Sequence, residues 1–273
     1  MNILKLLDKF SDDSFFTKQT SRLDNLSDIT SFGKKAALAA LPLGLGSFMA
    51  TSAKAETKNE PSVAMKSALT DALQLALTLE YLEDEYYRIG LQTANLIPTG
   101  DRAVFMQISK HEAAHVTFLK GALNSLQTTP VAKPTFDFTA NGAFSPFTNY
   151  QQFLTLAQAF EDTGVRAYKG QAGNVMSNKD VLQAALQIHS VEARHASMVR
   201  RMRANKGWIE LGSGGSGSGG MPPATNPVYA GEQETMQAGF NTATAFGAAA
   251  GSAAYDEILT GAEATAIATL FID

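Results

Sequence analysis

The sequence predicts an all-α protein centred on a four-helix bundle with one long crossover, flanked by a signal-like N-terminal segment and a small C-terminal appendage. Three observations support this fold class. Apolar residues recur at spacings of three and four from about residue 62 to residue 206, which is the period of an α-helix. Every proline in that range lies between helical stretches, and residues 129–147 form a long connection without helical period. Long helices joined by short turns and one crossover are typical of such a bundle.

The composition excludes several classes of chemistry. The 273 residues include no cysteine, which rules out disulfides, thiolate nucleophiles and cysteine-held zinc or iron–sulfur sites. The net charge of −4 provides no basic surface, so no nucleic-acid partner is expected. With 45% hydrophobic residues the chain can form a sizeable core. Metal or acid–base chemistry therefore has to come from 26 carboxylates and four histidines.

Residues 1–55 are predicted to be an N-terminal arm with a signal-like segment. A lysine pair precedes an uncharged run, residues 36–50, and Ala53-Lys54-Ala55 after it has the small-x-small form of a signal-peptidase site. These are the parts of a secretory signal, so we expect a periplasmic or exported protein. The alternative is an arm whose Ala/Leu helix packs on the body. If it is not cleaved, this segment is the only part expected to contact a membrane.

The bundle itself is expected over residues 62–206 as two pairs of antiparallel helices. Pro98-Thr99-Gly100-Asp101 marks a short turn within the first pair, and Ser177-Asn178 marks one within the second pair. Each helix is expected to span roughly 28–32 residues, about 45 Å at 1.5 Å per residue. Residues 129–147 then form the crossover between the pairs.

A Gly/Ser-rich linker is predicted over residues 207–226, and a C-terminal appendage over residues 227–273. The appendage is expected to end in a short helix that begins with a capping box formed by Thr260 and Glu263. The apolar face of this helix is predicted to consist of Ile267, Leu270 and Phe271. Nothing in the appendage suggests chemistry.

Each bundle helix carries one glutamate in the middle of its inward-facing apolar stripe, and two helices add a histidine three residues later. The six candidate metal ligands are Glu80, Glu112, His115, Glu161, Glu192 and His195. Four ionised carboxylates in a core are unfavourable unless something compensates them, and no lysine or arginine falls on these stripes. Two divalent cations would balance the four charges. Mixed carboxylate and imidazole donors favour two iron or two manganese ions over magnesium or calcium, and leave zinc open.

The spacing of these residues indicates two copies of one helical hairpin. Glu80 and Glu112 are 32 residues apart, and Glu161 and Glu192 are 31 residues apart. In each half a single glutamate on one helix is matched by Glu-x-x-His on the next, which predicts a pseudo-twofold axis through the site. The alternative is that these are solvated carboxylates on helices whose phase is off by one, which requires four independent phase errors.

Tyr87 and Tyr168 are the candidate catalytic residues, because each lies seven residues after its helix's glutamate, two turns along the same face. Their hydroxyls could bind ligand carboxylates or relay an electron; the alternative is a pair of core aromatics. Glu83 and Asp84 lie about a turn after Glu80. For these two acids an extra ligand, a proton carrier, an entry-path carboxylate and a solvated face all remain open.

Several neighbouring residues are expected to support the site or the fold. His111 and His189 flank the ligand stripes, which favours a surface or supporting role over ligation. Gly164, one turn after Glu161, could leave room for a substrate, a water or a neighbouring helix. The remaining group is basic and ends the fourth helix, where positive charge complements the helix dipole. It consists of Arg200, Arg201 and Arg203.

The order of these motifs resembles that of the ferritin-like dimetal carboxylate superfamily: one Glu, then Glu-x-x-His, a long crossover, one Glu, then Glu-x-x-His. Over residues 62–206 the chain is most similar to bacterial exported ferritin-like domain proteins related to desiccation-related proteins. Their N-terminal signal and C-terminal extension correspond in general character to residues 36–55 and 222–273. The resemblance implies a bundle with a di-iron or di-manganese centre.

The resemblance leaves the reaction open, because relatives include ferroxidases, peroxide reductases, manganese catalases and storage cages. We expect a dimetal oxidoreductase that takes oxygen or peroxide as its small-molecule substrate. The alternative is a non-enzymatic envelope protein in stress protection or metal binding, with a structural or vestigial site. Whether the protein forms a homo-oligomer also stays open at the level of sequence.

Overall fold

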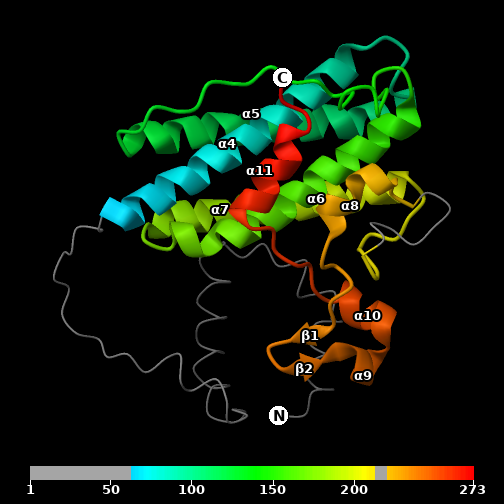
Figure 1. Cartoon of the computed structure of the whole chain (residues 1–273). Coiled ribbons are helices and arrows are strands. Elements are labelled where there is room, and N and C mark those ends of the chain that lie inside the picture. The colour runs from blue at the N-terminus through cyan, green and yellow to red at the C-terminus, as the bar shows by residue number, and fades with distance from the viewer. Residues whose placement is uncertain (1–62, 213–219) are drawn as a thin grey trace, which may run out of the picture. The chain divides into compact units, whose positions relative to one another are not determined.

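The computed structural model describes residues 63–212 and 220–273, and four long helices make up its centre (Figure 1). Helix α4 packs along α5, α6 packs along α7, and α4 also packs against α6. This arrangement confirms the predicted all-α bundle with one long crossover, which runs between α5 and α6. The bounds of the four helices are Val63–Gln92 for α4, Thr99–Ser125 for α5, Tyr150–Val175 for α6 and Lys179–Met202 for α7.

Local hydrogen bonds explain where these helices begin. The side chain of Asn149 accepts a hydrogen bond from the backbone N–H of Gln152 at the start of α6, and Asn178 does the same for Val181 at the start of α7. Such caps satisfy N–H groups that have no partner within the helix. Helix α5 instead begins directly after Pro98, without a side-chain cap. The helices contain 30, 27, 26 and 24 residues, so three of them are shorter than predicted.

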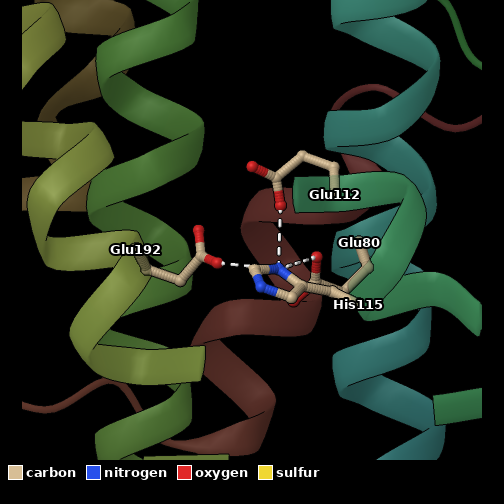
Figure 2. Close-up of side chains that lie close together, drawn as sticks. All are labelled: Glu80, Glu112, His115 and Glu192. Carbon is tan, nitrogen blue, oxygen red and sulfur yellow. Dashed lines mark hydrogen bonds and ion pairs between the residues drawn. The ribbon is translucent and has the colours of Figure 1, made fainter. Parts of the chain in front are cut away.

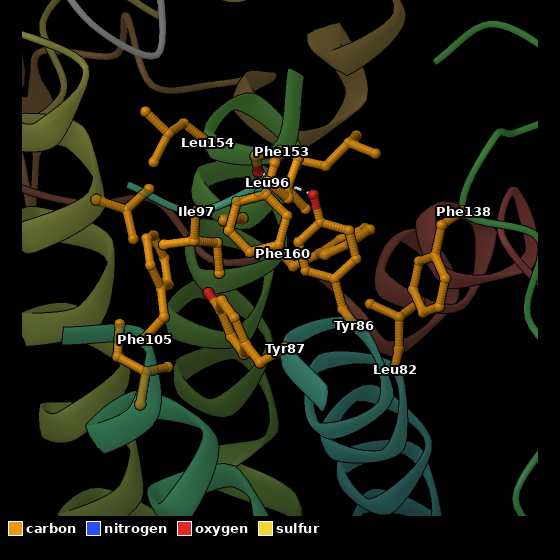
Figure 3. Close-up of a cluster of buried hydrophobic side chains, with 14 of the residues drawn as sticks. Leu82, Tyr86, Tyr87, Leu96, Ile97, Phe105, Phe138, Phe153, Leu154 and Phe160 are labelled. Carbon is orange, nitrogen blue, oxygen red and sulfur yellow. Dashed lines mark hydrogen bonds between the residues drawn. The ribbon is translucent and has the colours of Figure 1, made fainter. Parts of the chain in front are cut away.

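The core of the bundle consists largely of two apolar clusters, and on α5, α6 and α7 the predicted ligands fall between them in sequence. One cluster is rich in aromatic rings; within it Tyr86 stacks on Phe153 with centroids 4.9 Å apart, and Phe105 meets Phe153 edge-on (Figure 3). The other is mainly aliphatic and includes Leu77 and Leu123. The carboxylates therefore lie in a polar layer with dry packing on either side.

The C-terminal segment adds short elements to the bundle. They are the 3-10 turn Pro223–Thr225, α8 Asn226–Tyr229, β1 Met236–Gln237, β2 Phe240–Asn241, α9 Thr242–Phe246, α10 Ala248–Ala253 and α11 Gly261–Thr269. The two strands pair antiparallel, Met236 with Asn241 and Gln237 with Phe240. Both turn residues, Ala238 and Gly239, have positive φ, which suits the twist of a two-residue hairpin loop.

Helix α11 packs on both α4 and α6 (Figure 1). The predicted capping box is present, because the Thr260 side chain and the Glu263 side chain each bind the other residue's backbone N–H. Ile267 and Phe271 are buried as expected. Leu270 was expected on the same apolar face, and this was wrong: it is 48% exposed. The helix ends at Thr269, so Leu270 follows the last turn on the solvent side.

Helix α6 is buried without interruption from Phe153 to Tyr168, because the C-terminal segment covers the face that the bundle leaves open. Arg166 donates hydrogen bonds to the backbone carbonyls of Val228, Ala230, Glu257 and Ile258. It also forms an ion pair with Glu232 at 2.9 Å. A buried guanidinium requires acceptors for its five N–H groups, and backbone carbonyls of the C-terminal segment supply most of them.

A second buried network joins the same face of α6 to α7 and α8. Asp162 accepts hydrogen bonds from Arg200 and from the Tyr229 hydroxyl, the latter at 2.7 Å. Gln158 donates to the same hydroxyl at 3.0 Å. The sequence suggested only that Arg200 complements a helix dipole. Its buried partner Asp162 is 38 residues away, so no local pattern indicates the pair.

The predicted N-terminal arm and signal-like segment, residues 1–55, lie outside the described residues, as do residues 213–219 of the predicted linker. On either side of that gap Ile209 and Thr225 are buried, so the ends of the predicted linker belong to the packed structure. Among the described residues no helix combines the length and the apolar character needed to cross a membrane.

Candidate metal centre

The six predicted ligands come together in the interior of the four-helix bundle. Helix α4 contributes Glu80, α6 contributes Glu161, and α5 and α7 each contribute a Glu-x-x-His pair. All four carboxylates are fully buried, with 0% exposure, and His195 is 5% exposed. A stripe spacing of three and four turns these side chains toward a common axis, because residues three and four apart share one face of a helix.

The ligand atoms form two overlapping groups, each with atoms that lie within 4.8 Å of one another. The first group is Glu80, Glu112, His115 and Glu192, and the second is Glu112, Glu161, Glu192 and His195. Glu112 and Glu192 belong to both groups. Each group therefore has its own glutamate and histidine, and two glutamates can serve both positions. This is the arrangement that the predicted pseudo-twofold axis requires.

The surroundings of His115 show how closely the first group converges (Figure 2). Its Nδ1 atom lies 3.2 Å from Glu80 Oε2, 3.0 Å from Glu112 Oε2 and 3.1 Å from Glu192 Oε1. A ring nitrogen carries at most one hydrogen, so it can donate to only one of these three oxygens. Three carboxylates and an imidazole nitrogen directed at one point form a donor set for a cation.

The second group repeats this geometry around His195. Its Nδ1 atom lies 3.0 Å from Glu112 Oε1, 3.2 Å from Glu161 Oε2 and 3.7 Å from Glu192 Oε2. Its other ring nitrogen, Nε2, lies 2.9 Å from His111 Nδ1, and the two rings are stacked. The amide of Gln107 donates to the far nitrogen of His111. This supporting role for His111 agrees with the sequence expectation.

The electrostatics of the cluster reflect buried charge. Desolvation raises the pKa of Glu80 and of Glu161 well above 4.5, and neighbouring carboxylates add to the effect. Burial alone would lower the pKa of His115, but the carboxylates of Glu112, Glu192 and Glu80 beside its ring raise it to about 12. Burial likewise opposes ionisation of Glu192, yet the two imidazoles beside it lower its pKa to about 2.

The residues present fit a pair of divalent cations. Glu112 Oε1 and both carboxylate oxygens of Glu192 are buried and accept no hydrogen bond from any residue that the structure describes. The nearby imidazoles lie within ion-pair distance of them, but two rings cannot serve so many acceptors. Leaving buried carboxylate oxygens unsatisfied is costly. Two divalent ions would neutralise four glutamates and occupy these oxygens.

The two candidate catalytic tyrosines bind the ligand carboxylates across the bundle. Tyr87 on α4 donates to Glu161 Oε1 on α6 at 2.5 Å, and Tyr168 on α6 donates to Glu80 Oε1 on α4 at 2.6 Å. Burial and the adjacent carboxylates raise the pKa of both phenols well above 10. Both side chains therefore stay neutral donors that orient a carboxylate, and a catalytic role for them stays a prediction.

The rotation of each helix determines whether the other residues singled out in the sequence face the centre. Glu83 is buried beside the centre whereas Asp84 is partly exposed, so of these two acids only Glu83 lies on the inward face of α4. Gly164 leaves space for carboxylates, since a side chain there would approach Glu83 and Glu192. His189 donates to the backbone carbonyl of Val165 at 2.9 Å and belongs to neither ligand group.

Comparison with known families agrees with the geometry. A sequence model described as the ferritin-like domain matches residues 68–205, which is 138 of the 273 residues and spans all four bundle helices. No curated protein matches the chain.

Proposed function

Because the chain belongs to the ferritin-like domain family, we propose that it binds two iron or two manganese ions and uses them to react with oxygen or peroxide. The observation that carries this proposal is that Glu112 and Glu192 are shared between two buried ligand groups. A core without a metal function would be simpler with leucine at these six positions, since buried carboxylates are unfavourable without compensation.

Each position would be held by its own glutamate and histidine together with the two shared glutamates. Two redox-active ions held close together supply the electrons needed to reduce an O–O bond. The protein's part is to hold the ligands in place and to keep the layer dry. Tyr87 and Tyr168 orient the unshared carboxylates, and the aromatic and aliphatic clusters on either side exclude water.

The decisive experiment loads the metal-free protein with iron(II) or manganese(II) without oxygen and measures bound metal by elemental analysis. We expect about two ions per chain. Oxygen and peroxide pulses are then followed by the absorption of the oxidised metal pair and by loss of the oxidant. Glu112→Ala and Glu192→Ala should abolish both metal retention and oxidant consumption. Glu85→Ala is the control, since Glu85 pairs with Arg88 and Lys133 at the surface.

The experiment also separates the enzyme from a non-enzymatic protein. If two ions bind but neither oxidant is consumed faster than by free metal, the oxidoreductase proposal is wrong. The protein would then act in metal binding or envelope stress protection. If no iron or manganese binds, the dimetal proposal fails while the bundle stands.

We further propose that the protein is exported, as in the bacterial exported relatives related to desiccation-related proteins. The support is the sequence pattern of residues 36–55. Expression with a C-terminal tag, followed by cell fractionation and determination of the mature N-terminus, tests this. Cleavage after Ala55 is expected; an intact N-terminus in the cytoplasmic fraction would contradict export.

A further inference from the structure

The two helical hairpins differ at one position beside the metal centre. Glu80 corresponds to Glu161 and Tyr87 to Tyr168, and both pairs are separated by 81 residues. The same offset relates Glu83 to Gly164, since 83 + 81 = 164. One half of the centre therefore has an additional carboxylate where the other half has no side chain.

The glycine provides the space that this additional carboxylate occupies. A Cβ atom placed on Gly164 would lie 3.3 Å from Glu83 Oε1 and 3.5 Å from Glu192 Oε2. Both oxygens thus approach the same point on α6, and Glu83 lies next to a glutamate shared by the two ligand groups. Any larger side chain at Gly164 would crowd these carboxylates.

Glu83 has the burial and the unsatisfied oxygen that are expected of a metal ligand. It is 1% exposed, and its Oε2 atom is buried and accepts no hydrogen bond from any residue in the described part of the chain. Its neighbour in the space beside Gly164 is Glu192 Oε2. This is the oxygen of Glu192 that lies 3.7 Å from His195 Nδ1, whereas Glu192 Oε1 lies beside His115. A buried carboxylate without a partner destabilises the fold unless a hydrogen-bond donor or a cation compensates it.

We propose that Glu83 is a fifth carboxylate ligand that serves only the metal position formed by Glu112, Glu161, Glu192 and His195. The two metal positions are then inequivalent: the position with Glu83 has five protein ligands, and the position around His115 has four. This inference rests on the dimetal function proposed above and adds to it that one ion is bound more tightly than the other.

The test titrates cobalt(II) into the metal-free full-length protein and follows heat and visible absorption. The wild type should bind two ions in distinguishable steps. In Glu83→Gln, which keeps the shape of the side chain, the tighter step should weaken by about tenfold or more, with the weaker step unchanged within about twofold. The cobalt absorption of one equivalent should change, because it depends on the number of ligands.

Two further variants guard against indirect effects. Gly164→Ala should weaken the same step, because its methyl group would lie 3.3 Å from Glu83 Oε1, which has to shift, whereas its 3.5 Å distance to Glu192 Oε2 is an ordinary contact. Glu85→Gln, two residues along the same helix, should leave both steps unchanged, since that side chain pairs with Arg88 and Lys133. Thermal unfolding followed by circular dichroism confirms that each variant is folded at the titration temperature.

The outcomes distinguish this inference from the function on which it rests. If Glu83→Gln binds both cobalt ions with wild-type affinities and an unchanged spectrum, Glu83 is not a ligand, although the dimetal centre stands. If the folded wild type binds no cobalt, iron or manganese, both proposals are overturned.

Discussion

At the scale of single residues, the two tyrosine hydroxyls link the halves of the candidate metal centre. Each extends from the helix of one unshared glutamate to the glutamate of the opposite helix. A ligand carboxylate that accepts such a hydrogen bond is held in one orientation, which is how residues behind the ligands tune metal affinity. The bonds also connect α4 and α6 at the level of the site.

Replacing Tyr87 by phenylalanine should weaken metal binding without unfolding the protein. The variant leaves Glu161 Oε1 without its donor, so affinity at the position around His195 should fall by about 10- to 100-fold. Tyr86→Phe is the matched control, because that hydroxyl donates to the backbone carbonyl of Phe153. It should lower stability by about 1 kcal/mol but leave metal affinity intact. Equal affinities for both variants would argue against the orienting role.

The titrating groups of the cluster predict how the stability of metal-free protein depends on pH. The pKa of Glu80 and of Glu161 is raised above 4.5, and that of His115 is raised from 6.5 to about 12. Between about pH 5 and pH 8 the folded state therefore binds more protons than the unfolded state. The free energy of unfolding falls as pH rises through this window. Glu192, with a pKa of about 2, has the opposite effect only below 4.5.

Urea unfolding of chelator-treated protein at several pH values checks this prediction. Metal-loaded protein should lose the trend, because cations replace the protons that balance the carboxylates. A metal-free protein whose free energy of unfolding rises from about pH 5 to pH 8 would show that other groups dominate.

At the scale of elements, α6 is the helix that contacts both the metal centre and the C-terminal segment. One face supplies Glu161 to the metal centre, and an adjacent face supplies Gln158, Asp162 and Arg166 to the C-terminal segment. These three polar residues recur every four positions, so they share a face. The backbone N–H of Leu259 donates to the carbonyl of Arg166 at 3.1 Å. The C-terminal segment therefore lies so close to α6 that the residue one helical turn after Arg166 has to be small.

Gly170 is that small residue, and Gly170→Ala should destabilise the protein. A Cβ atom there would collide with the backbone carbonyl of Leu259, so the segment has to move away from α6 at a cost of about 1–3 kcal/mol. Gly173→Ala is the control on the same helix, because nothing in the described structure outside the adjacent helix backbone lies within 4 Å of the added carbon. It should stabilise by up to about 1 kcal/mol through helix propensity. Urea unfolding of both variants measures the difference.

At the scale of the whole molecule, the C-terminal segment completes the fold. Leu79 and Ala159 of the bundle share one apolar cluster with Tyr229, Leu259 and Ile267. Phe271 enters the aromatic cluster of the bundle, where its ring meets Phe160 edge-on at 4.8 Å. Without this segment, both the apolar surface and the charged side chains that are now buried on the outer face of α6 would be exposed to solvent.

Arg166→Met should be among the most destabilising single changes in the chain. It removes the donors to four backbone carbonyls and leaves the buried carboxylate of Glu232 without its ion pair. Breaking one side of a buried pair costs about 3–5 kcal/mol. Arg194→Met is the control, since among the described residues Arg194 bonds only to Ser190 in its own helix, and it should change stability by about 0.5 kcal/mol or less. Similar urea midpoints for the two variants would contradict this role.

Much of the bundle and its centre could be predicted from the sequence because the signals are local. Helical period, prolines between helices and the turn at Ser177-Asn178 are read within a few residues. So is the Glu-x-x-His spacing, which puts two ligands on one face of a helix. The structure brings all six predicted ligands together; whether they bind metal stays a prediction. The capping box of Thr260 and Glu263 was likewise visible in the sequence.

What only the tertiary structure decided depends on which helices are neighbours and how each is rotated. Period alone could not choose between Glu83 and Asp84, since a rotation of about 100° per residue places either near the seam. Nor could it pair Asp162 with Arg200, or direct each tyrosine to the opposite glutamate. These contacts join residues tens of positions apart, and their geometry exists only once the helices have packed. The sequence by itself determined the donors of the centre; packing determined which of them is supported, crowded or left without a partner.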